Sequence, residues 1–175
     1  AASNAQTSAN TANTTLADIA ADNKLTPIEK HQARQEWDVI AAEKVVNDTQ
    51  ATTFGITTEK TAYGTAFQEL ATYLNAGTTW SSGTPSWLAD ANLGTTTTIT
   101  GSTFRAKWKA YYDARTALLN AIAAKAKALA DAAQTAANGA ATAAANAQAA
   151  AAYADRLARS SNNLIKNGNS EDPNP

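Results

Sequence analysis

Apolar residues recur along this chain at steps of three and four residues, which is the spacing of an α-helix, and they do so in four separate segments. In residues 1–21 the steps alternate strictly between four and three, as in a heptad seam. The seam positions are Ala5, Ala9, Ala12, Leu16 and Ile19. The pattern predicts a short N-terminal helix over residues 1–21.

The string Thr26-Pro27-Ile28-Glu29 has the composition of a helix start. A threonine at the N-cap, a proline in the first helical position and a glutamate three residues after the cap make a capping box. We expect a second helix from here to about Thr52, with charged residues such as Lys30 and Lys44 on its outer faces. Its expected apolar face consists of Ala33, Trp37, Ile40, Ala41 and Val45.

A third helix is expected to begin near Thr57 or Thr58 and to end before Gly77. Its apolar stripe is Tyr63, Ala66, Phe67, Leu70, Tyr73 and Leu74. Residues 77–101 then hold four of the eight glycines, and they predict a long loop. The apolar residues expected to pin this loop to the helices are Trp80, Trp87, Leu88, Leu93 and Ile99. The threonine run 95–98 favours a short strand, for which the sequence offers no clear partner.

The fourth segment, from Thr103 to about Ser160, has no proline and a single glycine, Gly139. It predicts a helix of about 87 Å at 1.5 Å per residue. Its first third is aromatic and the remainder is nearly all alanine. A strict heptad stride through the alanine part collects the large apolar residues into one seam, which contains Ile122, Leu129, Ala136, Ala143, Ala150 and Leu157.

These segments predict an elongated all-α chain, in which a small helical bundle is followed by a long alanine-rich, coiled-coil-like helix. The expected parts are an N-terminal helix (1–21), a helical bundle (22–120) with its tryptophan-containing loop (77–101), an alanine-rich helix (121–163), and a linker or the start of a following domain (164–175).

Composition adds a constraint on assembly. The chain has 44 alanines among 175 residues and only 24 Leu, Ile, Val and Phe residues together. Hydrophobic stabilisation scales with buried area, and an alanine buries little. Because the alanine-rich helix cannot be covered by the rest of the chain, we expect a parallel homo-oligomer, with three copies as the expected number.

Several classes of function are disfavoured by the same numbers. There is no cysteine, one histidine (His31) and a net charge of −1, so thiolate chemistry, a histidine-rich metal site and a nucleic-acid footprint are not expected. No nucleophile–base pair or phosphate-binding loop is visible, and we expect neither catalysis nor a cofactor. No apolar run is long enough to predict membrane insertion. The absence of methionine even at position 1 suggests a fragment or a processed chain.

Two groups of residues are candidates for binding. Asp18, Asp22, Thr26 and Glu29 stand at spacings found in calcium-binding loops, although the glycine of such loops is missing, and the capping box explains the same residues. Trp80 and Trp87 lie in the loop, where they can contact a ligand such as a host glycan or instead pack against the helices.

Three strings resemble segments of known protein families. The string from Leu16 to Lys30 (LADIAADNKLTPIEK) and the string from Ile99 to Arg115 (ITGSTFRAKWKAYYDAR) are similar to segments of tail-tip and host-specificity (central tail fibre) proteins of long-tailed bacteriophages. The string from Asn163 to Asn169 (NLIKNGN) resembles the opening strand of a carbohydrate-binding jelly-roll domain, although Ser170-Glu171 departs from the usual Phe-Glu.

The resemblance implies an extracellular virion component that is usually trimeric, joins neighbouring tail domains and takes part in host attachment. It implies no catalytic residues. We therefore expect a helical spacer of a tail fibre or tail-tip protein. Two alternatives remain open: a glycan- or receptor-binding module that uses Trp80 and Trp87, and the stalk of a bacterial surface adhesin.

Overall fold

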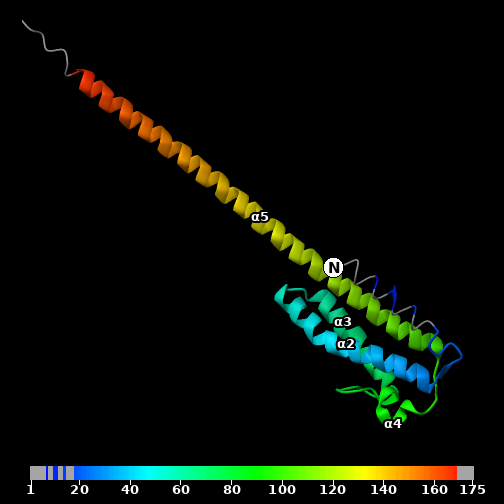
Figure 1. Ribbon diagram of the computed structural model, residues 1–175. Coiled ribbons are helices and arrows are strands. Elements are labelled where there is room, and N and C mark those ends of the chain that lie inside the picture. Colours follow the sequence, from blue (N-terminus) through cyan, green and yellow to red (C-terminus); the bar gives the residue numbers. More distant parts are fainter. Residues whose placement is uncertain (1–6, 8–9, 12–13, 15–17, 169–175) are drawn as a thin grey trace, which may run out of the picture. The chain divides into compact units, whose positions relative to one another are not determined.

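The computed structural model describes residues 7, 10, 11, 14 and 18–168, and over these residues the chain is all-α apart from one pair of two-residue strands. The elements are β1 (Lys24–Leu25), α2 (Pro27–Thr53), α3 (Thr58–Leu74), the 3-10 turn η1 (Ser86–Leu88), α4 (Asp90–Leu93), β2 (Thr97–Thr98) and α5 (Gly101–Gly168). The chain divides into two compact units, residues 1–127 and 128–175. In the first unit, α2 and α3 pack beside the first part of α5 (Figure 1).

The N-terminal part of the chain is described at four positions before Asp18. Thr7, Asn10, Thr11 and Thr14 are helical and exposed, as expected for the first predicted helix. The predicted seam residues Ala5, Ala9, Ala12 and Leu16 lie outside the described residues. Ile19 is buried but lies in a turn, so the helix does not extend to residue 21 as predicted.

The predicted capping box at the start of α2 is confirmed. The Thr26 hydroxyl accepts a hydrogen bond from the Glu29 backbone N–H, and the Glu29 carboxylate accepts one from the Thr26 N–H at 2.8 Å. Pro27 occupies the first helical position, where its missing N–H leaves no intrahelical bond unmade. Helix α2 therefore begins at the predicted residue, and it ends at Thr53, within one residue of expectation.

The inner face of α2 differs from the predicted one. Val45 is 71% exposed, so its assignment to the apolar face is wrong, and so is the placement of Lys30 on an outer face, because its side chain is fully buried. Beyond Ile40 the same spacing of four and three residues brings Lys44 and Asn47 to the inner face. Hydrophobic patterning does not place these two polar residues there. Both find partners inside: the Lys44 ammonium lies 5.5 Å from the centre of the Phe67 ring, and the Asn47 amide donates to the Tyr63 hydroxyl at 3.4 Å.

Aromatic rings from α2, α3 and α5 form the centre of the first unit. Four of the six residues predicted for the α3 stripe are buried and the other two, Ala66 and Tyr73, are half-buried, while the buried Ala71 was not predicted. Phe67 stacks on Trp37 with ring centres 5.1 Å apart, and Tyr63 meets Tyr111 of α5 at 5.5 Å, with their hydroxyls 3.1 Å apart. Each fully buried large side chain contributes about 1.5–3 kcal/mol of hydrophobic stabilisation. These rings supply the burial that the alanine-rich sequence lacks elsewhere.

Hydrogen bonds from basic side chains of α2 help to hold the segment between α3 and β2 against the helices. The ammonium group of the buried Lys30 donates to the Asn92 carbonyl oxygen at 2.8 Å and to the Thr95 hydroxyl at 3.2 Å. Arg34 donates to the Leu88 carbonyl at 2.9 Å, one turn further along α2. Burial of Lys30 without an acidic partner lowers the pKa of its ammonium group. The predicted loop is therefore a docked segment that contains η1 and α4.

The predicted threonine strand has a partner that sequence patterning did not identify. β2 pairs antiparallel with β1, the two residues before the α2 cap, in the register Lys24↔Thr98 and Leu25↔Thr97. Asn23 extends this contact, since its carbonyl accepts from the Ile99 N–H and its side-chain oxygen accepts from the Gly101 N–H, both at 3.0 Å. We call residues 18–26 together with 97–105 the junction.

At the junction two backbones approach so closely that only glycine fits. A Cβ atom on Gly101 would lie 1.9 Å from the carbonyl oxygen of Ala20. Ala20 is itself constrained, because it is fully buried and has a φ of 56°, in the left-handed region that disfavours residues with a Cβ. The start of α5 is thus fixed against the turn that precedes α2.

We predict opposite effects for two glycine-to-alanine substitutions. Gly101→Ala should lower the free energy of unfolding by at least about 2 kcal/mol, because the new methyl group meets a backbone carbonyl that cannot move without breaking the junction. Gly64→Ala in α3 should raise the free energy of unfolding by about 0.5–1 kcal/mol, because alanine favours helix and no atom lies within 4 Å of the added Cβ. Urea unfolding followed by tryptophan fluorescence measures both, and equal effects would contradict the assigned contact.

Candidate functional site

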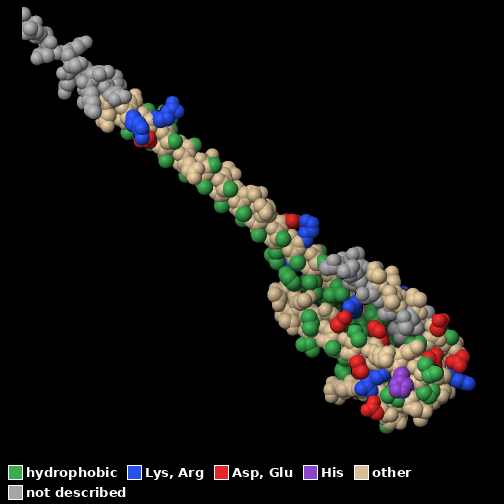
Figure 2. All heavy atoms as spheres, viewed as in Figure 1, with side chains coloured by type: hydrophobic (Ala, Val, Ile, Leu, Met, Phe, Trp, Pro, Cys, Tyr) green, Lys and Arg blue, Asp and Glu red, His purple; other side chains and the backbone are tan. Residues whose placement is uncertain are grey.

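The most extensive exposed surface in the second unit belongs to α5. From residue 124 to residue 162 every side chain is exposed, and residues 132–154 include no charged residue. Charged side chains on this part of the helix gather toward its two ends, with hydrophobic side chains spaced along the length between them (Figure 2). A surface helix normally carries charged residues on its solvent face, and this stretch departs from that pattern.

Threonine hydroxyls make this surface more apolar than its sequence suggests. Thr135 and Thr142 each donate their hydroxyl to the backbone carbonyl four residues earlier, at 2.9 and 3.0 Å. The hydroxyl hydrogen is then used within the helix, so the oxygen can only accept a hydrogen bond from a partner, and the threonine methyl group is exposed beside it. The exposed stretch therefore presents mostly methyl groups together with the amides of Asn and Gln.

The predicted seam residues divide between two environments. Ile122 is 8% exposed and belongs to the core of the first unit, so its side chain is already covered by its own chain. Leu129 and Leu157 are 51% and 54% exposed. The alanines between them in the seam, Ala136, Ala143 and Ala150, are exposed as well. The part of the seam that is open to a partner begins at Leu129.

Helix geometry constrains how these residues act together. Leu129 and Leu157 are four heptads apart, and a straight α-helix drifts about 20° per heptad from a 3.5-residue repeat. The two leucines therefore point about 80° apart on a straight helix, and they align when the helix supercoils left-handedly around partners. The seam is a single continuous face only in the second case.

The two loop tryptophans are held in different places and do not form one platform. Trp80 is half-buried and lies edge-on to Trp37 and Phe67, with ring centres 5.5 and 5.6 Å away, and its indole N–H donates to the Gly83 carbonyl. Trp87 lies edge-on to Tyr73 with ring centres 5.1 Å apart. Both rings anchor the loop, as the packing alternative predicts.

One of them also lines a groove. A hollow of about 410 Å³ between α2, α3 and the loop is lined by Trp80 together with Asp38, Lys44, Val45 and Gln68, among other residues. It offers an aromatic ring, an exposed valine and several polar side chains. This arrangement suits a small polar ligand with one apolar face.

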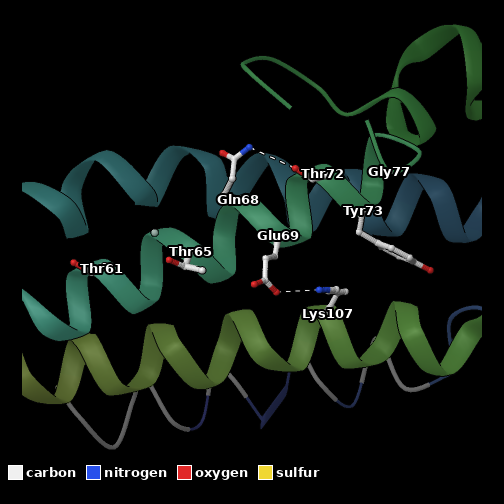
Figure 3. A pocket seen from close by; sticks show the side chains of 9 residues that line it. Thr61, Thr65, Gln68, Glu69, Thr72, Tyr73, Gly77 and Lys107 are labelled. Atoms are coloured by element: carbon white, nitrogen blue, oxygen red, sulfur yellow. Dashed lines mark hydrogen bonds and ion pairs between the residues drawn. The ribbon is translucent and has the colours of Figure 1, made fainter. Parts of the chain in front are cut away.

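A larger groove of about 620 Å³ lies on the outer side of α3 and was not predicted from the sequence. It is lined by threonines and Gln68 of α3, by Tyr73, and by Lys107 of α5, which pairs with Glu69 at 2.9 Å (Figure 3). Thr, Gln and Gly at outward helical positions are ordinary surface residues, so hydrophobic patterning gives no signal for it.

Three of the four candidate calcium ligands make hydrogen bonds within the chain, and the fourth, Asp18, is exposed. One oxygen of the Glu29 carboxylate accepts from the Ala20 N–H at 2.8 Å, and the other accepts from the N–H and the hydroxyl of Thr26 at 2.8 and 2.7 Å. A side-chain oxygen of Asp22 accepts from the Lys24 N–H. Over the part of the chain that the structure describes, no three acidic, histidine or cysteine side chains are grouped to hold a metal ion.

These hydrogen bonds also set the titration of Glu29. Partial burial of the carboxylate acts to raise its pKa, but the hydrogen bonds from Thr26 and Ala20 outweigh burial and hold the pKa below its ordinary value of 4.5.

His31 is exposed on α2. Among the described residues, none of the helices has the combined length and apolar character that crossing a membrane requires.

Comparison with known proteins gives one informative similarity. No protein-family model matches the chain, and no solved structure matches it. Over 108 residues, 62% of its length, the chain is 40% identical to the tail fiber protein of Enterococcus phage phiEF24C, and it spans only 5% of that protein. This similarity supports a relationship to phage tail fibre proteins, the coarser part of the resemblance noted in the two sequence strings.

Glu29 generates a prediction about acid and calcium. Because its pKa is lowered in the folded state, its contribution to stability is present above about pH 4.5 and is lost as the pH falls below that value. Glu29→Gln should remove this part of the acid dependence. Thr26→Ala should cost about 1 kcal/mol at neutral pH through the lost cap, and it should also weaken the acid dependence, because the Thr26 hydroxyl donates to the Glu29 carboxylate. Added calcium should leave the melting temperature of the wild type unchanged. A calcium-dependent rise that Glu29→Gln abolishes would instead favour the metal site.

Proposed function

We propose that this chain is a helical spacer module of a phage tail fibre or tail-tip protein, and that the exposed stretch of α5 joins copies of it into a parallel homo-oligomer, with three copies as the preferred number. The observation that carries the proposal is the uncharged, fully exposed stretch of α5, in a chain similar to part of a phage tail fibre protein. The proposed location is the virion, outside the host cell, between neighbouring tail domains.

Energetics support association of this stretch. Alanine-rich helices in isolation are marginal in water, and most helical stability in proteins comes from packing of one face. Without charged residues between positions 132 and 154, the helix also lacks the ion pairs that stabilise single helices. One buried alanine methyl contributes on the order of 0.8 kcal/mol. Several seam alanines together with Leu129 and Leu157 therefore give a modest stabilisation for each copy.

Parallel symmetry follows from the pattern of the seam. In a parallel rotational assembly each residue meets its own counterpart at the same height, so a seam of one residue type is complementary to itself. Small side chains let the helix backbones approach closely. Asn, Gln and Thr off the seam keep the outer surface hydrated.

The first unit would act as a folded body on this fibre, and its role in the proposal is mechanical. Its core is built from aromatic rings, and its docked loop is held by Lys30 and Arg34. We propose no catalytic role for this module, whose sequence has one histidine and no cysteine. Host attachment would then be a property of the whole fibre to which the module contributes length and spacing.

The groove at Trp80 supports a second candidate function, the binding of a host glycan or receptor. Its lining combines the Trp80 ring with Asp38, Lys44 and Gln68, a set that suits a neutral sugar. Titration of the chain with host surface polysaccharide tests it by tryptophan fluorescence. A saturable change that Trp80→Ala removes and Trp87→Ala retains would support this function, and no change with either protein would argue against it.

We predict that the seam substitution Ala143→Glu disrupts association. Three glutamates placed against one another in a narrow seam repel and lose water, whereas Ala145→Glu makes the same change on the opposite side of the same helix and should be tolerated. Analytical ultracentrifugation of the concentrated proteins measures the difference.

Because alanine buries little area, we expect the isolated chain to associate weakly. A chain fused after residue 175 to a parallel trimeric coiled coil therefore provides a second test by thermal unfolding. A wild type that is monomeric at every concentration, and a fusion that melts identically with and without Ala143→Glu, would contradict the proposal.

A further inference from the structure

The outer face of α2 is an uncharged stripe that runs the length of the helix. It comprises, at alternating steps of four and three residues, Ile28, Gln32, Gln35, Val39, Ala42, Val46 and Thr49. All seven are exposed, with Ile28 at 73%, Val39 at 52% and Val46 at 56%. We call these residues the neutral stripe.

The charges of α2 lie outside the neutral stripe and are used within the chain. Glu29 caps the helix, Lys30 and Arg34 hold the loop, and Asp38 pairs with Arg34. Further along the helix, Lys44 pairs with Asp48, while Glu36 and Glu43 bind side chains of α5. A solvent-facing helix surface usually carries the charges, and here they are directed away from it. The stripe is therefore exposed and carries no charge of its own.

A hollow beside the middle of the stripe has room for one side chain. It measures about 200 Å³ between α2 and α5, and it is lined by Glu36, Val39, Ile40, Glu43, Tyr112 and Arg115. Arg115 lies 2.7 Å from Glu43 and the Tyr112 hydroxyl donates to Glu36, but the buried Nη1 of Arg115 makes no hydrogen bond within the chain. The hollow therefore suits an uncharged side chain with an acceptor oxygen, such as glutamine, from a helix packed along the stripe, as in knobs-into-holes packing.

We propose that the neutral stripe of α2 contacts a second copy of this chain within the assembly, an inference that rests on the homo-oligomer proposed above. A copy held alongside by α5 presents a matching uncharged helical surface, with valine and glutamine side chains at the same spacing. The stripe has no Lys or Arg with which to bind a membrane surface or a nucleic acid.

The size of the stripe explains why it acts only inside an assembly. A helix of 27 residues is about 40 Å long, and a lane about 10 Å wide along it presents on the order of 400 Å². Stable interfaces bury about 800 Å² on each partner, so the stripe alone does not hold two free molecules together. When α5 already holds the copies, the high effective concentration makes so small a contact sufficient.

Site-specific photo-crosslinking tests the proposal directly. The chain has no cysteine, so Val39→Cys accepts a single benzophenone label, and Ala91→Cys, on the exposed surface of α4, is the matched control. Ala143→Cys, in the proposed α5 seam, reports whether the copies are associated at all. The full 175-residue chain, fused to the trimeric coiled coil, is labelled, irradiated and analysed by denaturing electrophoresis and mass spectrometry.

The expected result is a band of twice the chain mass that is severalfold stronger for the label at position 39 than for the label at position 91, with the attachment site mapped to a second copy. Crosslinking at position 143 without crosslinking at position 39 would overturn the proposal for the stripe and leave the oligomer intact. Absence of crosslinks at both positions would overturn both proposals. Crosslinking of position 39 only to added host or virion proteins would assign the stripe to a different partner.

Discussion

The small area that an alanine side chain can bury governs the organisation of this chain. Large side chains bury together in the first unit, where rings such as Trp37, Phe67 and Tyr111 pack from three helices. Beyond residue 123 the same helix that supplies part of this core carries no buried side chain through residue 162. Folding of the first unit is thus supported by its own core, whereas the alanine-rich stretch has no such support within the described chain.

The junction joins two segments that lie about eighty residues apart. Asn23 binds the backbone at Ile99 and Gly101, and the guanidinium group of Arg105 reaches the carbonyl oxygen of Ile19 at 3.4 Å. These residues belong to the two strings that carry the resemblance to phage tail proteins. The strings are therefore the two sides of one structural contact, which fixes the start of the long helix against the start of α2.

Much of the fold can be predicted from local sequence patterns. The capping box at Thr26, the stripe on α3 and the long uninterrupted helix were predictable because each depends on neighbouring residues or on a regular period. The inner positions of Lys30 and Asn47 were not, since their burial depends on acceptors and donors far along the chain: the Asn92 carbonyl for Lys30 and the Tyr63 hydroxyl for Asn47. Hydrophobic patterning also does not predict the pairing of β1 with β2, because a strand of two residues is too short to show an alternating pattern.

Some features of the candidate surfaces could likewise be predicted from the sequence, and others could not. Leu129 and Leu157, which a heptad count places in the predicted seam, are exposed, whereas Ile122 was assigned to that seam but belongs to the core. The grooves on α3 and at Trp80 depend on how outward side chains are arranged in space, which a linear pattern does not record. The neutral stripe of α2 can be recognised in the sequence only after the structure has shown which face of the helix points outward.

In the proposed assembly, copies of the chain cover and stabilise residues 128–157 of α5. Amide hydrogen exchange of this segment, measured by mass spectrometry at low and high protein concentration, distinguishes a covered helix from an exposed one. We expect fast exchange in the monomer and slow exchange once the copies associate, with the aromatic part of α5 around Trp108 protected at both concentrations. Equally slow exchange of residues 128–157 in a protein that sedimentation shows to be monomeric would contradict the proposed assembly.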